Sequence, residues 1–443
     1  MNCAPINLAW TGRFLRFIGY ILFFLMLVFP MVLELLYVKA FLFALLLYFL
    51  SIATIKRRRL ALHPTIFILA LFMTSVSLFF SLTGIIANTP GALKQAQVYA
   101  LWPLIYIILI TGVRDSAIIE GLQQTLVVAT IFLSIYGIIQ ILTNLLILPQ
   151  FFHLDLFKGG SSTAFGFYEG FTEMRFPGLN SLPFLIPFCM AALVTWLPGK
   201  GNSPTHRIWL WIALLLGIAI SIISGRRAIW LVIMLSPLLI FSLWLLKPKA
   251  EKRKTKHILI SSSLLLSLLL IAVFVLLQCV YEFDLTKIYE AFISGFNFSP
   301  TSGEIARKEQ FYTLLHGWLE HPLLGAGHGA SASAYGSIRS ETMPWAYELY
   351  YLALLYQVGL VGFLIYASGI AWAYYMGLKI IMTDTVLGRT LLPLMVGMTG
   401  MFIVTATNPY LMRFDGLWVI FLPIAVINCF LLKANKKKLV GVE

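Results

Sequence analysis

Long apolar runs recur from one end of the chain to the other, and they restrict the fold more than any other feature. Each run has the length needed to cross a bilayer as a helix, or nearly so, which takes about 20 residues. The expected spans lie at roughly 16–33, 40–55, 63–87, 98–113, 122–148, 179–197, 207–223, 228–246, 258–280, 349–377, 390–407 and 416–432. With 60% hydrophobic and 11% charged residues, the chain has too few polar groups to enclose its apolar surface in a water-soluble fold. We therefore predict an all-α polytopic membrane protein with about twelve transmembrane helices.

The connections between these runs define the domain organisation. Only a short break separates the runs at 16–33 and 40–55, so these form either two spans or a re-entrant pair. No internal repeat, low-complexity linker or soluble domain boundary interrupts the sequence, and residues 1–443 are expected to form a single membrane domain. Two connections are much longer than the others, a smaller loop at 149–178 and a larger loop at 281–347.

Basic residues indicate how the chain is oriented. Every second connection carries basic residues, including the clusters Lys56–Arg59 and 247–256, and the tail carries Lys436–Lys438, whereas acidic residues are concentrated in the other connections. The positive-inside rule then places both termini in the cytoplasm and the 149–178 and 281–347 loops outside. The net charge of +14 reflects this asymmetry, so we expect anionic membrane lipids as partners, and no nucleic acid.

The larger outer loop contains a predicted amphipathic helix over 302–320. It ends before Pro322, because the residue that precedes a proline disfavours the helical conformation. One face of the helix is predicted to carry an arginine and four apolar residues: Arg307, Phe311, Leu314, Leu315 and Trp318. Arg307 is therefore either a snorkelling or carboxylate-paired side chain, or an anion ligand that points to a site under the helix.

A glycine-rich turn, "HPLLGAGHGA" at 321–330, follows this helix. Gly325, Gly327 and Ala330 loosely match a dinucleotide-binding pattern, but no strand is expected before them, so we exclude a dinucleotide site. We expect a tight turn whose exposed backbone amides form an anion nest. His328 in this turn is either a site residue or a solvent-exposed loop histidine.

An acidic residue, Glu348, lies at the start of the expected span at 349–377. Its neighbours include Tyr347, Tyr350 and Tyr351, which are typical of the aromatic belt at a membrane interface. A glutamate at a helix N-terminus is stabilised by the helix dipole. An acid at the membrane boundary is also a candidate functional group.

Two adjacent arginines, Arg226 and Arg227, stand between two apolar runs in the segment "SGRRAIW" at 224–230. They either anchor the chain at the membrane interface or bind an anion.

Taken together, these stretches resemble the O-antigen ligase and Wzy-type polymerase superfamily. The segment "RKEQFYTLLHGWLEHPLLGAGHG" is similar to its arginine helix and Pro-Leu-Leu-Gly-x-Gly turn, and Glu348 stands 11 positions before Gly359 of a G-x-x-G pair. The segment "MRFPGLNSLPFLIPF" from Met174 resembles its R-x-x-G motif, and "SGRRAIW" resembles its outer Ser-Arg motif. The resemblance covers roughly 175–365.

The resemblance implies a fold similar to the C-type membrane glycosyltransferases (GT-C-like) and the transfer of a glycan from undecaprenyl pyrophosphate at the outer face of the bacterial inner membrane. It implies that Glu348 and Arg307 are catalytic. It implies three arginines as pyrophosphate ligands: Arg175, Arg226 and Arg227. The same loop supplies three further candidates: His328, Arg339 and Tyr347.

The sequence contains no Asp-x-Asp motif and no His/Asp cluster with ligand spacing. We therefore expect a metal-independent glycosyltransferase without a cofactor, in which arginines take the place of a divalent metal.

Three functions remain open. Ligases of this superfamily carry histidine at the position of Glu348, which favours a polymerase that joins lipid-linked repeat units into O-antigen or exopolysaccharide. The alternative is a ligase that transfers glycan to lipid A core. A transporter or flippase would place ionisable residues near mid-span, whereas here the charges cluster at the outer boundary. A separate chain-length regulator is a further partner to consider.

Overall fold

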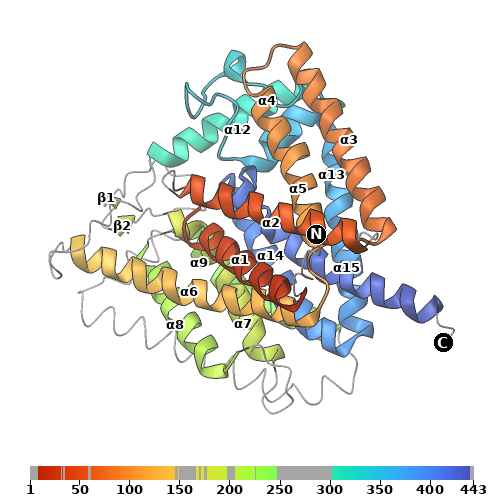
Figure 1. The fold of residues 1–443 in the computed structure, drawn as a ribbon. Helices are drawn as coiled ribbons and strands as arrows, with labels where there is room; N and C mark the ends of the chain where they lie inside the picture. Colours follow the sequence, from red (N-terminus) through yellow and green to blue (C-terminus); the bar gives the residue numbers. More distant parts are fainter. Residues whose placement is uncertain are drawn as a thin grey trace.

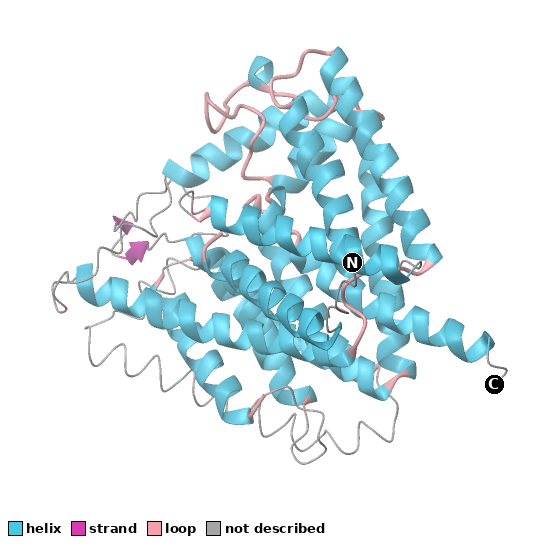
Figure 2. Cartoon of the chain, in the orientation of Figure 1, coloured by secondary structure: helices cyan, strands magenta, loops and turns pink. Residues whose placement is uncertain are grey.

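The structure is a computed structural model of the chain, and it describes residues 8–30, 32, 35–57, 61–144, 148, 166–168, 171–173, 177–196, 205–224, 226–246 and 302–439. Within these residues the fold is helical apart from one short hairpin (Figure 2), in which β1 (Gly166–Tyr168) pairs antiparallel with β2 (Phe171–Glu173). The expected span at 258–280, Arg175 and most of the 149–178 loop lie outside the described residues.

The helices of the described residues, in chain order, are α1 (Leu8–Val28), α2 (Leu36–Arg57), α3 (Pro64–Ile86), α4 (Ala92–Ala96), the π-helical turn η1 (Gln97–Leu101), α5 (Trp102–Ile110), α6 (Ser116–Asn144), α7 (Leu182–Thr195), α8 (Arg207–Ile223), α9 (Arg227–Leu245), α12 (Ser302–Glu320), α13 (Tyr350–Thr383), α14 (Thr385–Thr405) and α15 (Trp418–Leu439). Short 3-10 turns connect some of them: η3 (Pro177–Ser181), η4 (Ser333–Tyr335), η5 (Tyr410–Met412) and η6 (Phe414–Gly416). Figure 1 labels most of these helices.

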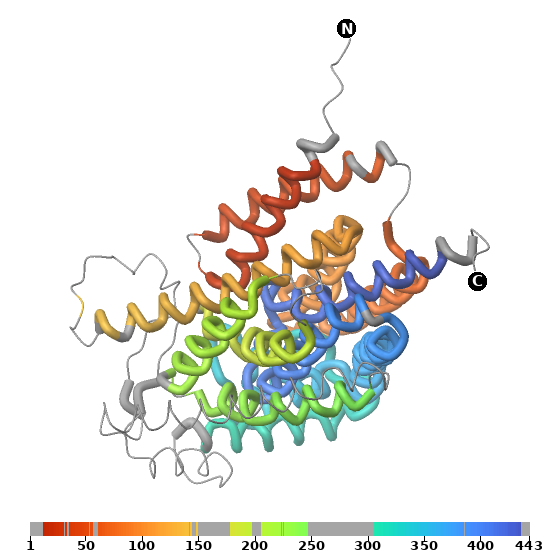
Figure 3. The backbone as a smooth tube through the Cα atoms, turned by 90° about the horizontal axis from the view of Figure 1, so that it is seen from below, coloured from red at the N-terminus to blue at the C-terminus, as the bar shows by residue number. Residues whose placement is uncertain are grey.

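Length and apolar composition confirm a polytopic all-α membrane protein. Eight helical segments of the described residues are long and apolar enough to cross a bilayer, and two shorter apolar helices lie at Leu36–Ile52 and Arg207–Ile222. Each expected apolar run within the described residues coincides with a helix, although α1 begins at Leu8, well before the expected start at about 16. The pair α1 and α2 packs side by side at the periphery (Figures 1 and 3).

The centre of the molecule is the packing of α7 against α14. Every residue of α7 is buried, which matches its apolar sequence on all sides. Two glycines of α14 allow this close approach, because a Cβ atom at Gly397 would lie 2.9 Å from the carbonyl oxygen of Phe184. Small residues at a helix crossing are typical of membrane bundles. The buried α7 fixes the position of η3, which directly precedes it and carries a residue of the site described below.

Helix α13 is broken at Gly359, where φ is +64° and ψ is −174°, a conformation that only glycine adopts without strain. The preceding glycine-rich loop supplies the hydrogen bonds that the break removes. The carbonyls of Tyr356 and Gln357 accept from the amides of Ala326 and Gly327, at 3.0 and 2.9 Å. The amides of Leu360 and Val361 donate to the carbonyls of Pro322 and Leu323, at 2.9 and 3.1 Å.

The same loop also attaches to α3 and to the residues that follow it. The amide of His328 donates to the carbonyl of Phe80 at 3.0 Å, and the amide of Gly91 donates to the carbonyl of Gly329 at 3.1 Å. Gly329 has a φ of +77°, and a Cβ atom there would clash with the backbone of Gly91. These contacts hold α12 and the loop after it on the end of α3 and α13 (Figure 1).

Candidate functional site

Arg226 is the N-cap residue of α9, in the sharp connection that follows α8. The connection is fixed from inside, because the indole of Trp230 donates to the carbonyl of Ser221 at 2.8 Å. The Arg226 guanidinium donates to Oδ1 of Asn180 at 3.2 Å and to the hydroxyl of Tyr410 at 3.0 Å. The predicted arginine pair therefore occupies the start of a helix, with Arg226 bound to residues of η3 and η5 and Arg227 half-buried beside it.

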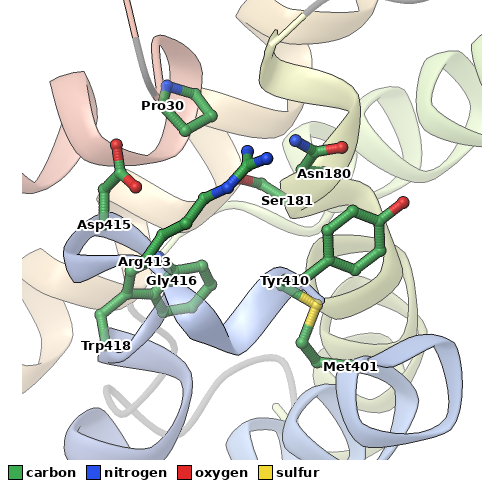
Figure 4. A pocket seen from close by; sticks show the side chains of 9 residues that line it. All are labelled: Pro30, Asn180, Ser181, Met401, Tyr410, Arg413, Asp415, Gly416 and Trp418. Atoms are coloured by element: carbon green, nitrogen blue, oxygen red, sulfur yellow. The ribbon is translucent and has the colours of Figure 1, made fainter. Parts of the chain in front are cut away.

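A pocket lies beside these contacts, and Figure 4 shows its lining. The lining consists of Pro30, Asn180, Ser181, Met401, Tyr410, Arg413, Asp415, Gly416 and Trp418. The Arg413 side chain extends into it toward Asn180 and Ser181 (Figure 4). Residues from the connection after α1, from η3 and from the connection between α14 and α15 thus meet next to Arg226.

Arg413 is not among the residues that the sequence predicts for the site. Its pKa lies below the ordinary value, chiefly because burial disfavours the charged form, and Arg339 and Arg226 act in the same direction while Asp415 opposes them. The electrostatic influence of Arg339 and Arg226 places three guanidinium groups in one neighbourhood. The available signal in the sequence was an arginine and an aspartate in a short connection between two spans.

An ion pair from the N-terminal helices supports this region. The Lys39 ammonium of α2 lies 3.4 Å from Oδ2 of Asp415, and it also donates to the carbonyl of Phe29. The exposed fractions of these two charged side chains are 8% and 12%, so the pair is nearly enclosed. Lys39 and Asp415 are a second set of residues near the site that the sequence did not indicate.

Glu348 forms the centre of a second charged group. Its Oε2 accepts from Nε of Arg307 at 2.7 Å, and its Oε1 lies 3.6 Å from Nε of Arg339. Its backbone amide donates to Oε1 of Gln310 on α12 at 3.0 Å. Helix α13 begins two residues later, and its N-cap, Leu349, makes no side-chain capping bond. The carboxylate therefore binds two guanidinium groups, and the carboxylate-paired interpretation of Arg307 is correct.

The buried face of α12 differs from the prediction. Phe311 is 44% exposed, whereas Leu314 is fully buried, and Gln310 and Thr313 are buried beside it. Gly317 continues this face, because a Cβ atom there would lie 2.7 Å from the ring of Tyr356. The apolar pattern predicted this face in part, since Leu314 lies in the buried cluster and Trp318 packs against it. A glycine and polar side chains that reach the neighbours of α12 complete the contact with α13.

The predicted anion nest is wrong. The amides of Gly325, Ala326, Gly327 and His328 donate to the carbonyls of His321, Tyr356, Gln357 and Phe80, which leaves them no proton for an anion. The glycines serve close backbone approach instead.

His328 is fully buried, which contradicts the expectation of a solvent-exposed loop histidine. Its ring stacks on Tyr99 with centroids 4.6 Å apart, and its Nε2 lies 3.2 Å from the hydroxyl of Tyr366. Burial lowers its pKa from 6.5 to about 3, although a hydrogen bond with Gln357 opposes the shift. The imidazole is thus neutral at physiological pH and holds the loop against α3, η1 and α13.

The other candidate from this loop, Tyr347, is also fully buried. Its hydroxyl accepts from the amide of Ala332 at 2.7 Å. This hydrogen bond links the start of η4 to the residues just before α13.

Four of the predicted residues thus fall into two groups. Arg226 lies beside the pocket and donates to two of its lining residues, and Arg307, Arg339 and Glu348 form the ion-paired group. Arg413 interacts electrostatically with both groups, since Arg226 from the first and Arg339 from the second each lower its pKa. Cations thus surround a single carboxylate at one side and line a pocket at the other, an arrangement suited to an anionic substrate that also gives up a proton.

Comparison with known proteins identifies part of the chain. Residues 212–367 match a family described as O-Antigen ligase. No curated protein matches the chain. The matched segment contains Arg226, Arg307, Arg339 and Glu348, whereas Arg413 lies beyond it.

Proposed function

We propose that this chain, whose residues 212–367 match a family described as O-Antigen ligase, is a polymerase of undecaprenyl-pyrophosphate-linked oligosaccharide repeat units. Its product is O-antigen or exopolysaccharide, made at the periplasmic face of the bacterial inner membrane by a protein whose termini are both cytoplasmic. The observation that carries the proposal is the Glu348 carboxylate held between Arg307 and Arg339 at the position where the family places its catalytic residue.

Glu348 acts as the general base. A hydroxyl of the acceptor sugar attacks C1 of the donor sugar, and the bond from C1 to the pyrophosphate oxygen breaks. The hydroxyl proton passes to the Glu348 carboxylate, and the electron pair of the broken bond leaves with the lipid pyrophosphate. General-base assistance of this kind contributes about 10²- to 10⁴-fold to the rate.

Arg307 and Arg339 position this carboxylate. Each guanidinium lies at a different carboxylate oxygen, so the pair fixes the plane of the carboxylate group. Gln310 binds the backbone of the same residue and ties it to α12.

Arg226, together with Arg227 and Arg175, binds the pyrophosphate of the donor. Departure of the pyrophosphate concentrates negative charge on its oxygens, and a fixed guanidinium stabilises that charge more in the transition state than in the ground state. Guanidinium groups supply this charge without a divalent metal.

The second function is ligation of finished glycan onto lipid A core. The family description favours it, whereas glutamate at the position where ligases carry histidine favours the polymerase.

The deciding experiment gives the purified protein in lipid nanodiscs an undecaprenyl-pyrophosphate-linked repeat unit, alone or with lipid A core. A ladder of longer lipid-linked glycans supports the polymerase. A single transfer product that requires lipid A core supports the ligase, and recovery of unchanged substrate from both mixtures refutes both enzymes. Arg16→Gln, at an exposed arginine of α1, is the matched control that should leave the ladder unchanged.

A further inference from the structure

Arg413 lies in the connection between α14 and α15, far along the chain from the other arginines of the site. Its side chain lines the same pocket as Asn180 and Tyr410, the two residues to which Arg226 donates. The guanidinium groups of Arg226 and Arg413 therefore have Asn180 and Tyr410 as common neighbours, and Figure 4 shows Arg413 in the pocket with these two residues.

The protein does not neutralise Arg413. Among the described residues, no carboxylate forms a close ion pair with Arg413, and none of their hydrogen bonds comes from its guanidinium. Arg226 and Arg339 add repulsion to the cost of its burial. A half-buried cation among other cations is stable when an anion occupies the same space.

The other polar groups of the pocket favour an oxygen-rich anion. Oδ1 of Asn180 and the oxygen of Tyr410 both accept from Arg226, which leaves the Asn180 amide nitrogen and the Tyr410 hydroxyl proton as donors. The pocket and the adjacent Arg226 thus offer two guanidinium groups, an amide and a hydroxyl. A pyrophosphate presents two phosphoryl groups with several acceptor oxygens, which suits a donor set of this kind.

Asp415 is the nearby group that could cancel the Arg413 charge, and Lys39 engages it. The Lys39 ammonium holds Asp415 at 3.4 Å and is itself fixed by the carbonyl of Phe29. Asp415 still acts on Arg413 electrostatically, so its carboxylate would pair with that guanidinium if Lys39 were absent.

We infer that Arg413 is a substrate-binding residue, which joins Arg226 in holding the pyrophosphate of the lipid-linked donor. Lys39 is a positioning residue that keeps Asp415 from neutralising Arg413. The inference rests on the proposed function for the identity of the donor, and it extends the site to the N-terminal helices and to the connection before α15, both outside the matched segment.

The test measures binding of farnesyl pyrophosphate, and separately of inorganic pyrophosphate, to the full-length protein in detergent by calorimetry. Arg413→Gln should raise the Kd for both probes about tenfold or more, because it removes charge-assisted hydrogen bonds. Arg413→Lys should raise it less, since lysine keeps the charge and loses the planar fork. Arg16→Gln should leave both Kd values unchanged.

Two results would overturn the role of Arg413. One is an unchanged Kd for both probes in Arg413→Gln and Arg413→Lys. The other is a loss confined to inorganic pyrophosphate, which would make the pocket a site for a free anion. Thermal unfolding shows whether each variant is folded. If Arg413→Gln does not fold, the Kd values of Arg413→Lys, which retains the charge, decide the question.

A double-mutant cycle tests Lys39. Lys39→Met should raise the Kd for farnesyl pyrophosphate several-fold in the wild-type background and leave it unchanged in the Arg413→Gln background, because the effect acts through Arg413. Equal losses in both backgrounds would refute the positioning role.

The same variants separate this inference from the proposed function. If the wild-type protein binds farnesyl pyrophosphate in an Arg413-dependent manner but makes no polymer, the donor site stands and the polymerase does not. If polymer forms equally in wild type and Arg413→Gln, with equal Kd values, the inference alone fails.

Discussion

Replacing Glu348 with glutamine separates a role in proton transfer from a role in holding the loop in place. The carboxamide has nearly the size of the carboxylate and can still accept a hydrogen bond from Arg307, but it presents an N–H group to one of the two arginines and no longer takes up a proton.

The expected structural effect is small. The exposed fractions of the side chains are 43% for each arginine and 23% for Glu348, so solvent screens both ion pairs. Ion pairs of this kind contribute about 0–1 kcal/mol each, so their loss lowers the free energy of unfolding by about 2 kcal/mol at most. Loss of a general base instead slows the reaction about 10²- to 10⁴-fold, which corresponds to about 2.7–5.5 kcal/mol in the barrier.

The assay is the initial rate of polymer formation per folded protein in nanodiscs, together with the Kd for farnesyl pyrophosphate. We expect Glu348→Gln to lose at least about 100-fold in rate with an unchanged Kd. The control is Glu341→Gln, at an exposed glutamate of the same loop, which should retain the wild-type rate. A Glu348→Gln rate within about threefold of wild type would show that no proton is transferred to this residue.

Glu348→His extends the test, because the ligases that this sequence resembles carry histidine at the corresponding position. A neutral imidazole also accepts a proton, so we expect partial activity that falls as the pH drops below about 6.5, the ordinary imidazole pKa. Partial activity without this pH dependence would contradict a shared base position.

Three further predictions concern topology, the arginine pair and the buried histidine. In a protein without native cysteines, Glu341→Cys should react with a membrane-impermeant maleimide added outside the cell membrane. Lys379→Cys should react only after the membrane is opened, and the opposite labelling pattern would refute the predicted orientation. Arg226→Lys should slow polymer formation at least about tenfold, because an ammonium lacks the planar fork of donors with which a guanidinium binds a phosphate, and equal rates would refute forked recognition. His328 binds a proton more readily in the unfolded chain, so its contribution to stability is lost as the pH falls from about 6.5 toward 3, by about 1–2 kcal/mol at pH 5. The melting temperature of His328→Gln should therefore fall less than that of wild type between pH 7 and pH 5. An equal fall in both proteins would refute the role of His328 protonation in the pH dependence of stability.

The positions of the helices followed from the sequence because a membrane span needs only a local run of apolar residues. The helix predicted at 302–320 has the same bounds as α12, because its end is set by Pro322 directly after it. Glu348 and Arg307 were identified from motif order, and they contact each other although 41 positions separate them.

The rest of the site depends on packing between distant segments. Arg413 reaches the pocket only because α14 packs on α7 and brings the connection before α15 beside η3. The burial of His328 results from contacts with α3, η1 and α13, none of which its neighbours in the sequence reveal. The apolar pattern predicted the buried face of α12 only in part for a related reason, since that face is set by a partner helix that comes later in the chain.

The break at Gly359 has a consequence for how the protein is made. Four backbone groups around the break are hydrogen-bonded to the loop at 321–327. An unpaired backbone group within a bilayer costs several kcal/mol, so α13 is a complete span only after that loop has docked on it. The loop is synthesised before α13, and it is already available when the helix leaves the ribosome. Membrane insertion of α13 and docking of the loop that follows the Arg307 helix are therefore one event, and a chain that inserts this span correctly has also brought Arg307 to Glu348.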